Sequence, residues 1–249
     1  MTAQTHGIFH RLSGEGRKVL MVSGLNGQAR FWDGITTTLS AQFSVLVFDQ
    51  KACGATPDDG AEWTIETLAA DAFAVAQSVF GDEPFAVVGH STGGAIAQHM
   101  AAAHPQQVDS VVLSGTWMRA DDYMRAVFDL RHELLTRAPD LDPVLGNLLR
   151  VPLDDFKPPV PAVALDPSVT LRRINALKGH DGTPLMERIN QPVMVIGAQD
   201  DRIVPIHLAR ELHERLAGST LTVLPDGGHF FPQTRATDFA QKITDWLSR

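Results

Sequence analysis

Short, uniformly apolar segments recur along the chain, and segments of helical length separate them. The apolar segments are KVLMVSG (18–24), SVLVFD (44–49), FAVVG (85–89), VDSVVLSG (108–115), PVMVIG (192–197) and TLTVL (220–224). Apolar residues at nearly every position, without alternation, are typical of strands covered on both faces, as in a parallel sheet. The pattern therefore predicts a mostly parallel sheet buried between helices.

The intervals between these strands have the composition and length of helices. The predicted helices span residues 64–80, 92–105, 205–217 and 236–247. Strands that alternate with helices indicate an α/β fold, with a mostly parallel, twisted sheet and helices on both faces.

One long interval, residues 116–190, lacks this alternation. It contains the helix-periodic MRADDYMRAVFDLRHELLTRA and then the proline-broken VPLDDFKPPVPAVALDP, without a convincing strand. Such an interval is too long for a plain loop. We therefore predict a helical cap at residues 116–190, inserted in a core built from residues 1–115 and 191–249.

Composition and charge narrow the classes of partner. Of the 249 residues, 44% are hydrophobic and 20% are charged, which suffices for one large core. The 29 acidic residues outnumber the 21 basic ones, the formal net charge is -8, and there is no basic run. This balance argues against nucleic acid and against an anionic membrane surface as partners. It leaves the oligomeric state open.

Cysteine usage and the N-terminal sequence bear on the compartment. Cys53 is the sole cysteine and cannot form an internal disulfide, as expected in a reducing environment. The N-terminal sequence has no apolar stretch long enough for a signal peptide, and no run reaches the roughly 18 apolar residues that a membrane span needs. We predict a soluble, cytoplasmic protein.

The stretch FAVVGHSTGG (85–94) surrounds Ser91 with glycines, between the end of a predicted strand and the start of a predicted helix. A turn this sharp strains its central residue, and Gly89 and Gly93 avoid collisions by lacking side chains. This is the G-x-S-x-G pattern of a nucleophile elbow, which raises a serine hydroxyl above the carboxyl edge of a sheet. We predict that Ser91 is a nucleophile; the alternative is an ordinary surface loop.

A serine nucleophile needs a base, and the base needs an acid to orient it. In elbow proteins both follow the serine along the chain, the acid first. The sequence AQDDRIVP follows one late strand, and PDGGHFF follows the last. We predict His229 as the base and Asp201 as the acid, with Asp200 as the alternative acid. His90 is interpreted as structural.

Hydrolysis of a carbonyl compound also requires donors for an oxyanion. Two backbone N–H groups are predicted to supply them: that of Thr92, after the nucleophile, and that of Leu25, in the loop SGLNGQ (23–28). The alternative for this loop is a simple strand-to-helix turn. The spacing of the histidines on the predicted helices does not suggest a metal site, and no metal or other cofactor is predicted.

The motifs GHSTGG, GAQDDRIVP and PDGGH occur in the order found in the α/β-hydrolase superfamily, which the chain resembles over its whole length. The stretches FDQKACGATPDD, GTWMRADDYMRAVFDLRHELL and LRRINALKGHD resemble aminoacrylate hydrolases of pyrimidine breakdown and 3-oxoadipate enol-lactonases. The separation of 28 residues between Asp201 and His229 is similar to that in related hydrolases. The resemblance implies hydrolysis of a small acyl or enol compound without a cofactor.

The chain departs from the family pattern near the predicted oxyanion loop. Ser23 stands where a histidine is usual, and Lys51, Ala52 and a single glycine, Gly54, follow Asp49 where an arginine and two glycines are usual. These departures bear on substrate preference more than on the reaction.

The sequence thus predicts a serine hydrolase that cleaves a small ester, lactone or related acyl or enol compound through an acyl-enzyme. Trp117 is predicted to lie near the substrate, with packing within the cap as the alternative. Arg119, Arg125 or Arg131 is a candidate to bind a substrate carboxylate, with solvent exposure on the cap as the alternative. The alternatives are a carbon-carbon bond hydrolase, a cofactor-free oxygenase or perhydrolase on the same fold, and a slow-turnover receptor that binds a ligand.

Overall fold

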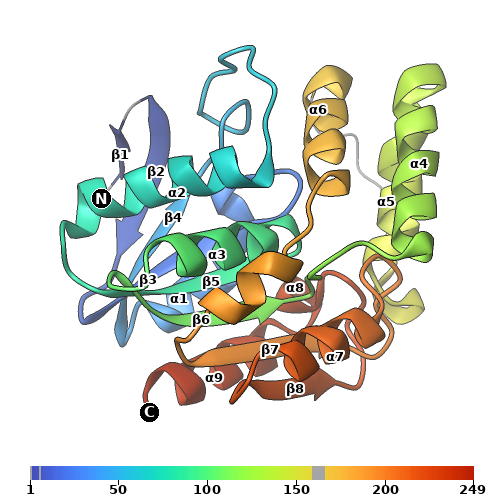
Figure 1. The fold of residues 1–249 in the computed structure, drawn as a ribbon. Coiled ribbons are helices and arrows are strands. Elements are labelled where there is room, and N and C mark those ends of the chain that lie inside the picture. Colours follow the sequence, from blue (N-terminus) through green and yellow to red (C-terminus); the bar gives the residue numbers. More distant parts are fainter. Residues whose placement is uncertain (1, 6, 159–165) are drawn as a thin grey trace.

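A twisted sheet forms the centre of the computed structural model, which describes residues 2–5, 7–158 and 166–249 (Figure 1). Its described strands are β1 (Thr2–Thr5), β2 (Ile8–Ser13), β3 (Arg17–Val22), β4 (Phe43–Phe48), β5 (Phe85–His90), β6 (Val108–Ser114), β7 (Val193–Ala198) and β8 (Thr220–Leu224). They lie in the order β1-β2-β4-β3-β5-β6-β7-β8. The strands from β4 to β8 in this order are parallel, and they are the six strands that the apolar segments predict.

An antiparallel pair at one edge, β1 and β2, was not predicted. β2 pairs antiparallel with β4, and β1 with β2. Neither strand is covered on both faces: β1 is almost entirely exposed, and in β2 only Ile8 and His10 are buried. The uniformly apolar pattern that reveals the inner strands is therefore missing here.

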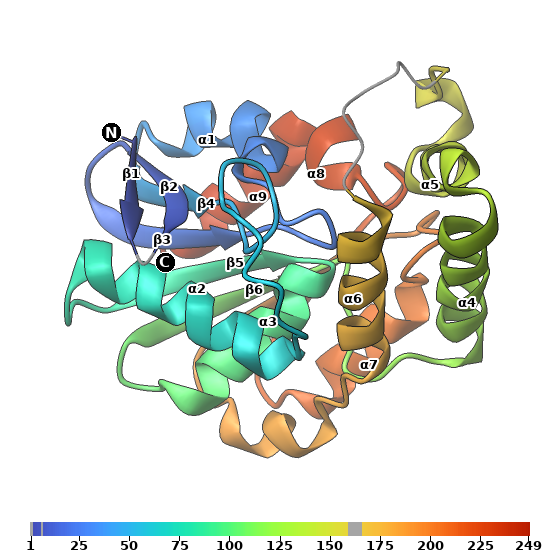
Figure 2. The same cartoon turned by 90° about the horizontal axis from the view of Figure 1, so that it is seen from above.

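Helices cover both faces of the sheet (Figure 2). One face carries α2 (Ile65–Phe80), α3 (Thr92–Ala103) and α7 (Ile206–Arg215), and the other carries α1 (Asp33–Leu39), α8 (Phe231–Thr234) and α9 (Ala236–Leu247). Successive strand residues point to opposite faces. Leu20 and Val22 accordingly pack on the first face, and Val19 and Met21 on the second.

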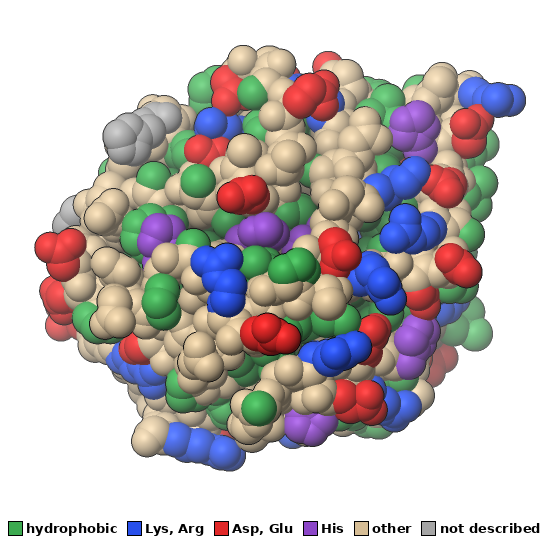
Figure 3. All heavy atoms as spheres, in the orientation of Figure 1, with side chains coloured by type: hydrophobic (Ala, Val, Ile, Leu, Met, Phe, Trp, Pro, Cys, Tyr) green, Lys and Arg blue, Asp and Glu red, His purple; other side chains and the backbone are tan. Residues whose placement is uncertain are grey.

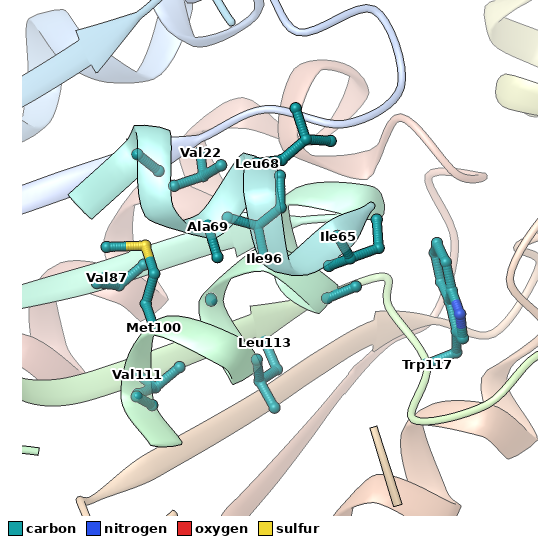
Figure 4. Packing of buried hydrophobic residues seen from close by; sticks show 14 of the residues in the cluster. Val22, Ile65, Leu68, Ala69, Val87, Ile96, Met100, Val111, Leu113 and Trp117 are labelled. Atoms are coloured by element: carbon teal, nitrogen blue, oxygen red, sulfur yellow. The ribbon is translucent and has the colours of Figure 1, made fainter. Parts of the chain in front are cut away.

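The packing on the first face is shown in Figure 4. Ile65 and Leu68 of α2 and Ile96 of α3 lie over Val87 and Leu113 of the sheet. Each is at most 3% exposed, and burying an aliphatic side chain of this size contributes about 1.5–3 kcal/mol. This packing holds the start of α3 against the carboxyl ends of β5 and β6.

The interval predicted to form a cap contains α4 (Asp122–Arg137), α5 (Asp142–Arg150) and α6 (Pro167–Lys178). Short 3-10 segments accompany them at Pro139–Leu141, Leu153–Asp155 and Thr183–Arg188, and another, Ala29–Trp32, precedes α1. The helices α4 and α6 pack together beside the sheet (Figures 1 and 2). Residues 159–165 of the predicted cap lie outside the described residues, and the division into core and cap remains a prediction.

Two further properties of the structure are the distribution of charge on the surface and the apolar length of the helices. Acidic and basic side chains are interspersed on the face shown in Figure 3. Within the described ranges, no helix has both the length and the apolar character that crossing a bilayer requires.

His180, which follows α6, is buried, and its burial predicts that the unfolding free energy depends on pH. It is 5% exposed, and neither ring nitrogen has a hydrogen-bond partner among the described residues. Burial, and next the nearby His99, lowers the pKa of His180 from 6.5 to about 4. Protons therefore bind the unfolded state better, and the unfolding free energy decreases as the pH falls from 6.5 towards 4.

Replacing His180 with glutamine should remove this contribution. Between about pH 7.5 and about pH 5, the wild type should lose about 2 kcal/mol more unfolding free energy than His180→Gln. Urea denaturation of both proteins at the two pH values measures this difference. Equal losses in the two proteins would contradict the prediction.

Candidate active site

Ser91 lies at the sharp turn between β5, which ends at His90, and α3, which begins at Thr92. Its φ of 56° and ψ of -123° place a residue with a side chain in a region that favours glycine. The Ser91 N–H donates to the carbonyl of Ser114 at 2.8 Å. This bond ties the turn to the end of β6.

The three glycines around Ser91 are explained by close approaches of other groups. A Cβ at Gly89 would collide with the carbonyl oxygen of Gly93, and one at Gly93 with the carbonyl oxygen of Val22. At Gly94 it would collide with the side chain of Thr116. The glycines let α3 start directly against the sheet, with Ser91 at the turn itself.

His229, in the loop between β8 and α8, reaches the hydroxyl of Ser91. Its Nε2 lies 2.9 Å from Ser91 Oγ, and its Nδ1 lies 2.7 Å from Asp201 Oδ2. All three residues are buried, at 7% exposure or less. With Nδ1–H donating to the carboxylate, Nε2 is left to accept the serine proton. The structure thus brings Ser91, Asp201 and His229 into one hydrogen-bonded line.

The two adjacent aspartates have different surroundings. Asp201 Oδ1 accepts hydrogen bonds from the N–H groups of Ile203 and Val204, at 2.8 and 2.9 Å, which leaves Oδ2 for the imidazole. Asp200 Oδ1 instead accepts from the Gly228 N–H at 2.9 Å. Asp201 therefore lies against the ring, and Asp200 fixes the loop that carries it.

The loop after β3 lies close beside the serine. The Gly27 N–H donates to the Gly24 carbonyl at 2.9 Å, which closes a turn with Leu25 near its corner. An ideal Cβ on Gly24 would be 3.0 Å from Ser91 Cβ, so the loop could not approach as closely with a larger residue. Thr92 is the first residue of α3, where N–H groups lack a partner within the helix. Both predicted oxyanion donors thus belong to segments beside Ser91.

Gln50 holds the same loop from behind. Its amide donates to the Ser23 carbonyl at 2.8 Å, and its backbone N–H to the Gly27 carbonyl at 2.7 Å. Arg173 of α6 donates to Gln50 Oε1 at 2.8 Å and to the Lys51 carbonyl at 2.6 Å. The family usually has an arginine at this point after Asp49. Here the Lys51 carbonyl accepts a hydrogen bond from an arginine of the predicted cap, Arg173.

A cavity of about 300 Å³ opens onto Ser91 and His229. The loop 23–28 and Phe31 form part of its wall, and α4 and α5 contribute Phe128, Arg131 and Arg150. The wall combines rings and aliphatic surface with a few polar groups, as in sites for small molecules. The cavity is therefore a candidate substrate pocket.

His90 lines this cavity but is held by its neighbours. Its Nδ1 lies 3.0 Å from Ser114 Oγ, and its ring stacks on Phe31 at a centroid distance of 5.1 Å. Burial, and next the nearby His229, holds the pKa of His90 well below its usual range. A neutral His90 adds no positive charge beside the imidazole of His229.

Trp117 and two of the candidate arginines do not line the cavity. Trp117 is fully buried in the hydrophobic cluster and contacts His180 edge-on, which corrects the expectation that it lies near the substrate. It lies three residues after the end of β6, at the edge of the cluster in Figure 4. The backbone of Arg119 forms an isolated antiparallel β-bridge with that of Asp181, and the side chain of Arg125 donates to the Ala120 carbonyl.

Several pocket residues were missed from the sequence. Phe31 joins the wall from the 3-10 segment Ala29–Trp32, and Gln233 joins it from α8. Phe230 comes from the loop that carries His229, and Arg150 from α5. The position of Phe230 next to His229 was the one available signal. Within the part of the chain that the structure describes, no group of three or more His, Cys, Asp or Glu residues is arranged to hold a metal ion.

This fold is that of an alpha/beta hydrolase. Residues 19–242 match the alpha/beta hydrolase family, and the chain belongs to it. The proposed carbamate hydrolase RutD of Shigella flexneri serotype 5b is 31% identical over 223 residues, which cover 85% of this chain and 84% of the relative. The superfamily and fold predicted from the sequence are thereby confirmed.

Solved structures agree on the fold. The enol-lactonase from Burkholderia xenovorans LB400 superposes with a TM-score of 0.86 at 22% identity, covering 100% of both chains. A bromoperoxidase from Bacillus anthracis gives a TM-score of 0.85 at 19% identity and covers 97% of this chain and 95% of its own. The family and its relatives support a hydrolase that acts on a small molecule.

The strained backbone at Ser91 predicts an effect on stability. Ser91→Gly should raise the unfolding free energy by about 1 kcal/mol relative to Ser91→Ala, because glycine adopts a positive φ without the clash of a Cβ. Both variants lack the hydroxyl, so the comparison isolates the backbone. Urea unfolding curves measure it, and a less stable glycine variant would show that the turn is not strained.

Proposed function

We propose that the protein is a serine hydrolase that cleaves a small ester, lactone or related acyl or enol compound through an acyl-enzyme. The observation that supports this most is the buried line of hydrogen bonds from Asp201 through His229 to Ser91, which ends at a cavity. This is the arrangement that converts a weak serine nucleophile into an effective one.

In the proposed reaction, Ser91 Oγ attacks the substrate carbonyl while His229 Nε2 takes the hydroxyl proton. Asp201 stabilises the imidazolium that forms and keeps the ring oriented. His229 then returns the proton to the leaving group, and the acyl group remains on Ser91. In deacylation, water attacks the acyl carbonyl while His229 Nε2 takes its proton, and His229 then returns the proton to Ser91 Oγ as the acid product leaves.

The backbone N–H groups of Leu25 and Thr92 are proposed to stabilise the oxyanion. Support comes from the close approach of the loop after β3 to Ser91 and from the place of Thr92 at the start of α3. The bonds from Gln50 keep that loop in place without using these two N–H groups. The helices at residues 116–190 are proposed to act as the cap, since they supply one wall of the cavity.

The comparisons support the substrate class. RutD is described as a proposed carbamate hydrolase, and the neighbour from Burkholderia xenovorans as an enol-lactonase. Both descriptions concern acyl compounds, and a cavity of about 300 Å³ is at the lower end of the range for small-molecule sites. We infer that this chain acts on a compound of comparable size.

Loss of the hydroxyl should abolish turnover. With a short-chain 4-nitrophenyl ester, the wild type should show a burst and then steady release of nitrophenol, and Ser91→Ala should lower kcat by at least about 10³-fold. A serine-directed phosphonate should label wild-type Ser91, as mass spectrometry of peptides would show. Failure of this labelling would contradict the proposal. A single slow turnover with tight retention would instead favour a receptor.

The adjacent aspartates provide a matched pair of variants. Asp201→Asn should lower kcat by about 10³- to 10⁴-fold, because an amide next to Nδ1 no longer favours the productive tautomer. Asp200→Asn should change kcat by less than about threefold, because the amide oxygen still accepts from the Gly228 N–H. Steady-state kinetics with the same ester distinguish the two. The reverse ranking would assign the acid role to Asp200.

A further inference from the structure

The wall of the active-site cavity is strongly biased towards positive charge. Arg30, Arg131 and Arg150 line it, and among its described lining residues there is no aspartate or glutamate. Asp201 lies behind His229 and does not line the cavity. The whole chain carries a net charge of -8, so this bias is local and opposite in sign to the protein as a whole.

Arg131 of α4 already has an anionic partner. Its Nε and Nη2 donate to the two carboxylate oxygens of Asp142 at 2.7 and 2.8 Å. Both side chains are at most 8% exposed. A bidentate ion pair of this kind neutralises the charge of Arg131 and leaves it little capacity to bind another anion. Arg131, a sequence-based candidate to bind a substrate carboxylate, therefore binds the carboxylate of Asp142 instead.

Arg150, the last residue of α5, has no such partner. Among the described residues, none accepts a hydrogen bond or forms an ion pair with its guanidinium. Its Cζ lies 5.3 Å from the ring centroid of Phe230, the residue next to His229. Burial, and next the charge of Arg131, lowers the pKa of Arg150 to about 10. The guanidinium therefore stays charged at neutral pH and faces the cavity without an ion-pair partner of its own in the described part of the chain.

A glycine in α5 makes room for this arrangement. A Cβ on Gly146 would collide with Nη2 of Arg150 and would lie 3.0 Å from its Nε. Glycine is unfavourable in the interior of a helix, yet here it lets the guanidinium fold back along α5. Gly146 thus positions Arg150.

We propose that Arg150 binds a carboxylate of the substrate, so that the preferred substrates are small esters or lactones that carry a free carboxylate. A planar guanidinium matches a carboxylate in a two-pronged hydrogen-bonded pair. Its contact with Phe230, the neighbour of His229, puts the guanidinium on the His229 side of the cavity that Ser91 also lines. This inference rests on the proposed esterase function.

The test compares a charged and a neutral ester of the same acid. Initial rates of hydrolysis of monomethyl glutarate and dimethyl glutarate are followed in a pH-stat. The wild type should prefer the monoanionic ester in kcat/KM. Arg150→Gln should lower kcat/KM for the monoester by roughly 10- to 100-fold, mainly through KM, and change that for the diester by less than about threefold.

Two further variants separate a local contact from a general charge effect. Arg137→Gln removes the same charge from an exposed site on α4 that does not line the cavity, and it should leave both esters unaffected. Gly146→Ala keeps every charge but displaces the guanidinium. It should reduce the preference for the monoester in the same direction as Arg150→Gln.

Several outcomes would overturn the inference. Equal kcat/KM of the wild type for the diester and the monoester would overturn the inference. This result needs no variant, so it decides the question even if Arg150→Gln fails to fold. Equal losses on both esters in a folded Arg150→Gln would also overturn it, because they indicate a structural role. Activity on both esters that disappears in Ser91→Ala keeps the proposed function intact in either case, so the two proposals fail separately.

Discussion

The backbone conformation of Ser91 is the constraint on which the site depends. A strand must end and a helix must begin within one residue, and that residue adopts a positive φ. The turn is kept in place by close backbone contacts at Gly89 and Gly93 and by the bond from the Ser91 N–H to β6. The cost of the strained residue is borne by the packing of α3 on the sheet, which is nearly free of exposed apolar surface.

From this turn outwards, each part of the site is held by a different segment of the chain. The loop after β3 approaches Ser91 because Gln50 bonds to it on two sides, and Arg173 of α6 bonds to Gln50 in turn. Asp201 orients the imidazole of His229, and Asp200 accepts a hydrogen bond from the N–H of Gly228, the residue before His229. The geometry therefore depends on polar contacts between separate segments of the chain, of which the bond from Arg173 to Gln50 spans 123 residues, as well as on the hydrophobic core.

The sequence predicted the parts of the structure that have a local signal. Apolar strands, the glycines at Ser91, and the aspartate and histidine after late strands are readable because strand ends converge at one edge of a parallel sheet. The antiparallel edge strands gave no such signal, since they are largely exposed. Trp117 and Arg150 were misjudged or missed because burial and pairing on the helices of residues 116–190 depend on tertiary packing, which no spacing in the sequence reveals.

One backbone contact connects the end of α5 to the imidazole of His229. The Phe230 N–H donates to the Arg150 carbonyl at 2.8 Å, and Gly228 lies against the same carbonyl. The peptide unit that follows His229 is therefore fastened to the end of α5, which contributes Arg150 to the cavity wall. A displacement of the end of α5 would therefore act directly on the loop that carries the imidazole.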